Sequence, residues 1–217
     1  MHAGRAVARD LTATARRTGS EAAIAAGVVA LGDVGFAVMP GLVDVPTLAS
    51  LRAELAQRDA DGQLTAASIG NASAREGTVV RGDRTAWLDD HSASGAEGLF
   101  RALVEDLRLA VNAALYLGLF RFDGHYALYP PGATYARHLD RFRDDDRRVV
   151  SLVLYLNEAW QPADGGALRL HLADGSTKDV LPVGGTVVAF LSEQFPHEVL
   201  AATRPRLALT GWLSRAR

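Results

Sequence analysis

The stretch Tyr135-Ala136-Arg137-His138-Leu139-Asp140 places a histidine and an aspartate two positions apart. In an extended strand, residues i and i+2 project from the same face, so an imidazole and a carboxylate can meet at one point without a bend in the backbone. A second imidazole, His197, comes much later, in the segment Phe195-Pro196-His197-Glu198-Val199. Two histidines and one carboxylate on one face of a metal ion, with other positions open, suit the oxygen chemistry of non-haem Fe(II). A His-x-Asp pair by itself is common on protein surfaces, so the surrounding residues must decide between the two interpretations.

Arg206, which follows His197 in the sequence, favours the interpretation as a metal site. It opens the apolar run Leu207-Ala208-Leu209-Thr210-Gly211-Trp212-Leu213, and a charge in so apolar a strand is costly unless a carboxylate pairs with it. No carboxylate nearby in the sequence is an obvious partner. The carboxylate of a ligand is therefore a candidate partner for Arg206.

These motifs resemble those of the 2-oxoglutarate- and Fe(II)-dependent dioxygenases. The residues around them look most like the prolyl 4-hydroxylase branch, which includes the oxygen-sensing hydroxylases that act on hypoxia-inducible factor and their bacterial relatives. The resemblance spans residues 81 to 213. The matching segments are Tyr129-Pro130-Pro131-Gly132, Tyr135 to Asp140, Leu154-Tyr155-Leu156-Asn157, Gly165-Gly166-Ala167-Leu168-Arg169, His197-Glu198-Val199, Arg206 and Trp212.

The resemblance implies a set of ligands for the metal and the cosubstrate. Fe(II) is expected on His138, Asp140 and His197. The far carboxylate of 2-oxoglutarate is expected on Arg206 and Tyr155, with Tyr129 near the other end of the cosubstrate. Thr210, on the same strand face as Arg206, is expected to line the same pocket. Dioxygen is the co-reactant, succinate and carbon dioxide are the co-products, and ascorbate is a candidate stimulant.

The resemblance also suggests a groove for a substrate. In the hydroxylases that this chain resembles, an Arg-Gly-Asp…Trp segment lies at the substrate groove, and Arg81, Asp83 and Trp87 match it. The resemblance likewise implies that Trp212 and one arginine contact the substrate. That arginine falls on Arg148, with Arg147 as the alternative. The expected substrate is a prolyl residue in a protein or peptide, with a translation factor as one candidate.

Composition narrows the remaining function classes. The chain has 217 residues, a net charge of −2 and no cysteine, so disulfides, thiolate metal sites and cysteine nucleophiles are excluded. The net charge gives no support for a nucleic-acid partner. No apolar run reaches the roughly 20 residues that a transmembrane helix needs. We therefore expect a cytoplasmic protein without nucleic-acid or membrane partners.

The pattern of elements predicts a mainly β fold with supporting helices. Residues 1–20 are expected to be a disordered or weakly helical leader, and residues 21–217 a single domain with helical support over 21–117 and a jelly-roll core over 118–214. Helices are predicted at Ala22–Leu31, from Asp44 or Pro46 onward, and at Ala96–Leu117. After Phe120, short strands separated by turn residues are typical of a double-stranded β-helix (jelly roll) backed by the helices. Its strands are predicted at 120–122, 125–129, 135–138, 149–156, 167–172, 178–180, 186–191, 198–200 and 207–213.

Three alternatives to prolyl hydroxylation stay open at this point. The same iron and 2-oxoglutarate site could hydroxylate a free amino acid or another small molecule, which would call for a closed pocket. Nucleic-acid demethylation is disfavoured by the position of Arg206 and by the net charge. A non-catalytic jelly-roll module is disfavoured because all four of His138, Asp140, His197 and Arg206 are present.

Overall fold

The computed structural model describes residues 3–67, 81–88, 95–140 and 147–216. Three α-helices in this part of the chain are α1 (Ala3–Val34), α2 (Val45–Ala60) and α3 (Gly95–Leu115). The strands are β1 (Phe36–Met39), β2 (Thr65–Ala66), β3 (Arg84–Trp87), β4 (Leu119–Tyr129), β5 (Tyr135–His138), β6 (Arg148–Tyr155), β7 (Leu168–His171), β8 (Thr177–Val180), β9 (Val187–Leu191), β10 (His197–Val199) and β11 (Arg206–Arg215).

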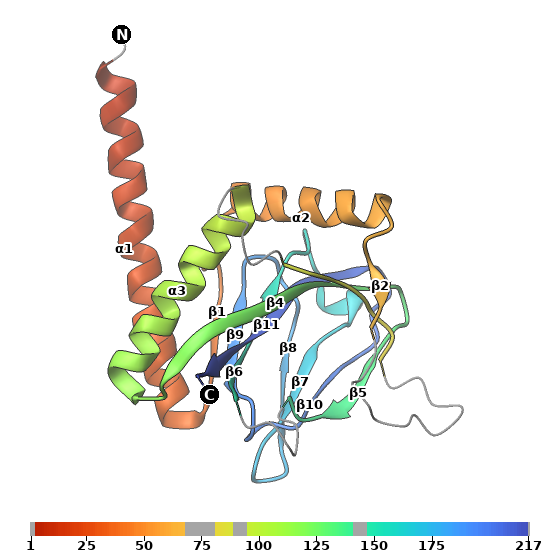
Figure 1. Ribbon diagram of the computed structural model, residues 1–217. Coiled ribbons are helices and arrows are strands. Elements are labelled where there is room, and N and C mark those ends of the chain that lie inside the picture. The colour runs from red at the N-terminus through yellow and green to blue at the C-terminus, as the bar shows by residue number, and fades with distance from the viewer. Residues whose placement is uncertain (1–2, 68–80, 89–94, 141–146, 217) are drawn as a thin grey trace.

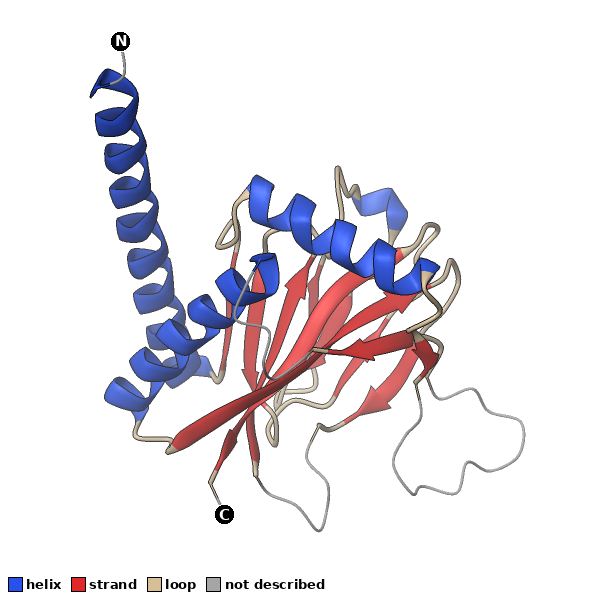
Figure 2. Ribbon diagram, turned by 45° about the horizontal axis from the view of Figure 1, so that its top comes forward, coloured by secondary structure: helices blue, strands red, loops and turns tan. Residues whose placement is uncertain are grey.

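The strands form two antiparallel sheets that face each other. The major sheet has the order β1-β9-β6-β11-β4-β3-β2, and the minor sheet has the order β5-β10-β7-β8. The helices lie on the side of the major sheet that faces away from the minor sheet (Figure 1). Figure 2 shows the same arrangement of helices over strands from a second side. The predicted jelly roll backed by N-terminal helices is confirmed.

The central strands of the major sheet are buried on both faces. In β6, Leu152 and Leu154 pack with the helices, whereas Val153 and Tyr155 pack in the space between the sheets. Val188 and Phe190 of β9 belong to the same inter-sheet cluster. Because both faces are covered, these strands are continuous apolar runs and do not alternate with polar residues.

The second helix forms as the sequence predicts. Asp44 caps its N-terminus, where Oδ1 accepts a hydrogen bond from Thr47 N at 2.9 Å. Leu48, Leu51 and Leu55 are its buried residues, and they share one helical face.

The other two helices are also present, and α1 differs from the prediction in its length. Helix α3 is present where the sequence predicts it, and near its start Phe100 is buried whereas Leu99 is 61% exposed. Helix α1 is longer than the predicted Ala22–Leu31, because it runs from Ala3 through position 20 to Val34. The division into a leader and a domain at residue 20 stays a prediction.

Strand β4 is one continuous strand, although a break at Asp123-Gly124 was predicted. Gly124 lies opposite Gly211 in β11, and a Cβ on Gly211 would come within 2.3 Å of the Asp123 carbonyl oxygen. The missing side chains allow the two strands to run past each other at this point. As a result β4 and β11 pair along their length and deliver alternate residues to the space between the sheets.

None of the helices in the described part of the chain is both long and apolar enough to cross a membrane.

Candidate active site

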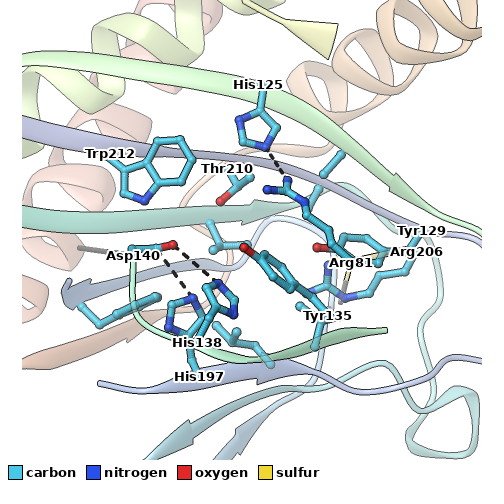
Figure 3. A pocket seen from close by; sticks show the side chains of 16 residues that line it. Arg81, His125, Tyr129, Tyr135, His138, Asp140, His197, Arg206, Thr210 and Trp212 are labelled. Atoms are coloured by element: carbon cyan, nitrogen blue, oxygen red, sulfur yellow. Dashed lines mark hydrogen bonds and ion pairs between the residues drawn. The ribbon is translucent and has the colours of Figure 1, made fainter. Parts of the chain in front are cut away.

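The metal-binding residues predicted from the sequence converge at one end of the space between the sheets. His138 ends β5, His197 begins β10, and Asp140 follows β5 by two residues. Each residue offers one donor atom, and these three atoms lie within 4.8 Å of one another. A metal ion about 2 Å from each donor could therefore reach all three. Figure 3 shows the two imidazoles and the carboxylate turned toward a common point.

Both imidazoles are held in the same way. His138 Nδ1 lies 2.8 Å from the Ala136 carbonyl oxygen, and His197 Nδ1 lies 3.0 Å from the Phe195 carbonyl oxygen. A ring that donates Nδ1–H to a carbonyl leaves its Nε2 lone pair free for a metal. The two Nε2 atoms indeed lie toward Asp140, each 3.6 Å from one of its carboxylate oxygens.

Asp140 is kept ionised by its surroundings. Burial alone would raise the pKa of Asp140, but His197, His138 and the Ser151 hydroxyl outweigh it, so the pKa lies below its usual range. Ser151 Oγ donates to Asp140 Oδ2 at 2.6 Å and is itself 2.9 Å from Ser192 Oγ. Burial lowers the pKa of His197, which favours its neutral form. An ionised carboxylate and neutral imidazoles are the protonation states that bind a divalent metal.

Arg206 supplies a buried positive charge deeper in the same space. The residue is 2% exposed, and its Nε donates to the Gly166 carbonyl oxygen at 2.9 Å. None of the ion pairs in the described part of the chain includes Arg206. The hydroxyl of the fully buried Tyr155, whose ring centre is 5.1 Å from the guanidinium carbon, also lacks a hydrogen-bond partner there. Burial raises the pKa of Tyr155 to about 12, so this hydroxyl stays protonated and can donate.

Gly166 holds the arginine in place. Its φ is +69°, a conformation that glycine adopts without strain, and this turns the carbonyl oxygen toward Arg206. A Cβ at this position would lie 3.4 Å from Arg206 Cδ and 2.9 Å from Ala202 Cβ.

Alternate residues of β4 and β11 line the inner cavity between the metal ligands and Arg206. From β11 they are Arg206, Ala208, Thr210 and Trp212, and from β4 they are His125, Ala127 and Tyr129. Thr210 thus lies in the predicted pocket, and its Oγ1 donates to the Leu152 carbonyl oxygen at 3.0 Å. The ring of Tyr129 lies 5.2 Å from the Arg206 guanidinium. The expected contact of Tyr129 with the metal end of the cosubstrate stays a prediction.

A wider outer groove opens from this cavity on the side of β3. Trp87, Arg148 and Trp212 line it together with the metal ligands His138 and Asp140. The Arg148 guanidinium stacks on Trp212, with 3.5 Å between its carbon and the ring centre. Of the two arginines left open by the sequence, Arg148 is the one that lines the groove.

Asp83 does not lie where the sequence analysis expected it. Its side chain is fully buried, and both carboxylate oxygens accept hydrogen bonds from Arg81, at 2.6 and 2.9 Å. The carboxylate is thus covered by Arg81 and is not presented to a substrate. Arg81 itself lines both the cavity and the groove, and its contact with a substrate stays a prediction. A sequence cannot show whether an Arg-Gly-Asp segment turns its two charges toward each other or toward solvent.

Three further residues of the site were not singled out from the sequence. Ser151 orients Asp140, and Tyr135 stacks on His138 with 3.6 Å between ring centres. His125 is 2% exposed and lies in the cavity. His125, Ala127 and Tyr129 are alternate residues of one strand and therefore share a face. This spacing could have placed His125 on the cavity face of β4.

The residues present fit Fe(II) and 2-oxoglutarate. The donor set of two imidazoles and one carboxylate suits Fe(II) and leaves coordination positions open. The buried Arg206 without a carboxylate and the buried Tyr155 hydroxyl without a partner match the far carboxylate of 2-oxoglutarate. When bound, this pair of groups supplies oxidation of a C–H bond with dioxygen.

Comparisons with known proteins agree with this geometry. Residues 124–214 match the model of the 2OG-Fe(II) oxygenase superfamily. A prolyl-4-hydroxylase of Pseudomonas putida is 49% identical, with a TM-score of 0.82 over 89% of this chain and 100% of that chain. A Trichoplax adhaerens prolyl hydroxylase, solved with a peptide from the oxygen degradation domain of hypoxia inducible factor, is 25% identical, with a TM-score of 0.82 over 93% of each chain.

A curated relative shows the same likeness in sequence. The hypoxia-inducible factor prolyl hydroxylase of Caenorhabditis elegans is 39% identical over 145 residues, which are 61% of this chain. The match covers 20% of the length of that relative.

A jelly roll that carries two histidines, an aspartate and a buried arginine around one cavity defines a 2-oxoglutarate- and Fe(II)-dependent oxygenase. Within that superfamily, this chain belongs to the prolyl hydroxylase branch.

Proposed function

We propose that this chain hydroxylates a prolyl residue of a protein or peptide at C4, with 2-oxoglutarate and dioxygen converted to succinate and carbon dioxide. His138, Asp140 and His197 would hold the iron. Arg206 and Tyr155 would hold the far carboxylate of 2-oxoglutarate and so orient its other end toward the metal.

The observation that carries the proposal is the outer groove joined to the metal site. Thr65, Trp87, Arg148 and Trp212 line it, and it shares His138 and Asp140 with the inner cavity. A free amino acid would need only the inner cavity, whereas a peptide could place one ring at the metal and lie along the groove. The relatives support the same reading, because one was solved with a peptide and another is called a hypoxia-inducible factor prolyl hydroxylase.

The test is incubation with Fe(II), 2-oxoglutarate and air, in parallel with free L-proline and with a panel of proline-containing peptides. The panel includes peptides from translation factors, which are one candidate class of substrate. Mass spectrometry should find one added oxygen on a prolyl residue and an equal amount of succinate. Hydroxylation of free proline together with no reaction of any peptide would favour the small-molecule alternative.

A substitution of Arg148 tests the role of the groove and leaves the metal ligands unchanged. Arg148→Ala removes the guanidinium that stacks on Trp212, and peptide turnover should fall by about tenfold or more at limiting peptide. Arg169→Ala is a matched control, because Arg169 pairs with Asp179 on the minor sheet and does not line the groove. Equal losses in the two variants would argue against a peptide in the groove.

A further inference from the structure

His125 is a buried polar side chain of the cavity that has no role in the reaction as described above. It projects from the centre of β4 and lines both the inner cavity and the outer groove. Its ring centre lies 4.9 Å from that of Trp87 and 5.6 Å from that of Trp212, so it packs against both indoles that line the groove. Figure 3 shows it across the cavity from the metal ligands.

Arg81 fixes the protonation of this imidazole. Arg81 Nη2 lies 3.2 Å from His125 Nε2. A guanidinium has only donors, so Nε2 must be the acceptor, and the ring is neutral with its proton on Nδ1. Burial, followed by the charge of Arg81, lowers the pKa of His125 to about 3, which agrees with a neutral ring. Arg81 is in turn anchored by two hydrogen bonds to the buried Asp83.

The Nδ1–H group that results is a buried donor without an acceptor. His125 Nδ1 has no hydrogen-bond partner among the residues that the structure describes, and the same holds for Trp212 Nε1. These two groups project from β4 and β11, which are neighbouring strands. An unpaired buried donor is unfavourable, so we expect a ligand to accept a hydrogen bond from each of the two groups. Neither can accept a hydrogen bond in this state, so the ligand must bring acceptors.

We propose that His125 is a specificity-determining residue that donates its Nδ1–H to a carbonyl oxygen flanking the substrate's prolyl ring. This inference rests on the proposed function. Proline has no backbone N–H, so a peptide at its prolyl residue offers carbonyl acceptors and lacks the donor that other residues would present. The N–H donors of His125 and Trp212, the first of them fixed by Arg81, match that pattern.

The first experiment reads the tautomer without any turnover. Nitrogen and carbon chemical shifts of the His125 ring are recorded by NMR at pH 7 in the protein loaded with diamagnetic Zn(II) and 2-oxoglutarate. The expected result is a neutral ring protonated on Nδ1, with Arg81→Gln as the variant that releases this preference. A charged ring, or a neutral ring protonated on Nε2, would overturn the proposal.

The second experiment compares two substitutions at the same position. His125→Leu removes the donor, whereas His125→Asn keeps an N–H close to the position of Nδ1. The KM for the peptide that the wild type turns over fastest should rise about tenfold in His125→Leu and about threefold or less in His125→Asn. If KM for the peptide rose equally in both variants, the role of His125 would be packing alone.

A thioamide peptide makes the test specific to this hydrogen bond. Sulfur replaces the carbonyl oxygen on either side of the proline in two synthetic versions of that peptide, because a thiocarbonyl is a weaker acceptor. One version should bind the wild type several-fold more weakly and His125→Leu no more weakly than the parent peptide. Equal effects on both proteins for both versions would refute the proposal. Failure of the proposed function is distinct, because the wild type would then hydroxylate no parent peptide.

Discussion

His138 and His197 are direct cross-strand partners in the antiparallel pair of β5 and β10. Their ring centres lie 4.2 Å apart, so the ladder between two strands that are distant in sequence sets the spacing of two metal ligands. Asp140 adds the third ligand from just beyond the end of β5. The site therefore depends on the pairing register, because a shift by one residue would turn one imidazole to the other face of the sheet.

His138→Ala and Asp140→Ala should each reduce Fe(II) affinity by more than about 100-fold and abolish turnover, because each removes one of three ligands. Stability of the metal-free protein should change by less than about 1 kcal/mol, since both side chains lie at the edge of the core. A competition titration measures the affinity, and Ser151→Ala should give a smaller loss of about tenfold by releasing Asp140. Wild-type iron affinity in the Asp140→Ala variant would sink the assignment.

Arg206→Ala should raise the 2-oxoglutarate concentration needed for half-maximal turnover. Loss of a buried charged partner costs on the order of 2–5 kcal/mol, while the iron ligands are untouched. Arg204→Ala is the matched control, since Arg204 is half-exposed and stacks on Trp160. An Arg206→Ala variant that lost iron and kept its dependence on 2-oxoglutarate would mean that the arginine serves another role.

Tyr155→Phe should separate stability from cosubstrate binding. The variant deletes a buried hydroxyl without a partner, so the cosubstrate-free protein should be as stable as the wild type or more stable by about 1 kcal/mol. Affinity for 2-oxoglutarate should fall about tenfold, because the carboxylate loses one donor. Denaturant unfolding and isothermal titration measure the two effects, and unchanged affinity would exclude Tyr155 from the carboxylate site.

Gly166→Ala and Gly132→Ala form a pair that isolates the support of Arg206. Both glycines have positive φ, so each substitution should cost about 1 kcal/mol of stability. Only at Gly166 does a Cβ also meet neighbours, which are Ala202, Trp160 and Arg206, whereas nothing lies within 4 Å at Gly132. We expect weaker 2-oxoglutarate binding in Gly166→Ala alone. Equal affinities in the two variants would contradict this role of the Gly166 carbonyl.

The buried His125 should make the protein less stable as the pH falls. Its pKa is about 3 in the folded state and about 6.5 in the unfolded chain, so below pH 6.5 the unfolded chain binds a proton that the folded protein does not. Stability is therefore lost from about pH 6.5 downward, and the contribution of His125 between pH 7 and pH 5 is about 2 kcal/mol. Urea unfolding of the wild type and His125→Leu at both pH values checks this. Parallel losses would show that His125 does not cause the decrease.

The jelly roll, the place of α2 and the convergence of His138, Asp140, His197 and Arg206 could all be predicted from the sequence. These features follow from local spacing or from a charge that needs a partner. The burial of Asp83 could not be predicted, because it depends on whether Arg81 turns toward Asp83 or toward solvent, and the sequence does not decide this. The continuity of β4 was missed for a related reason, since Gly124 reads as a turn until Gly211 is placed opposite it.

The major sheet divides the interior into two compartments: one apolar cluster packs with the helices on one face, and the other lies between the sheets on the opposite face. Residues such as Leu51, Val104 and Val111 stabilise the helical side, and the metal ligands and Arg206 lie on the other. Substitutions in the first compartment can change thermal stability while the second keeps its geometry. A mutant library confined to the helical side should therefore yield some more stable proteins with unaltered substrate preference. A library confined to the cavity side should yield proteins with altered substrate preference and no gain in stability.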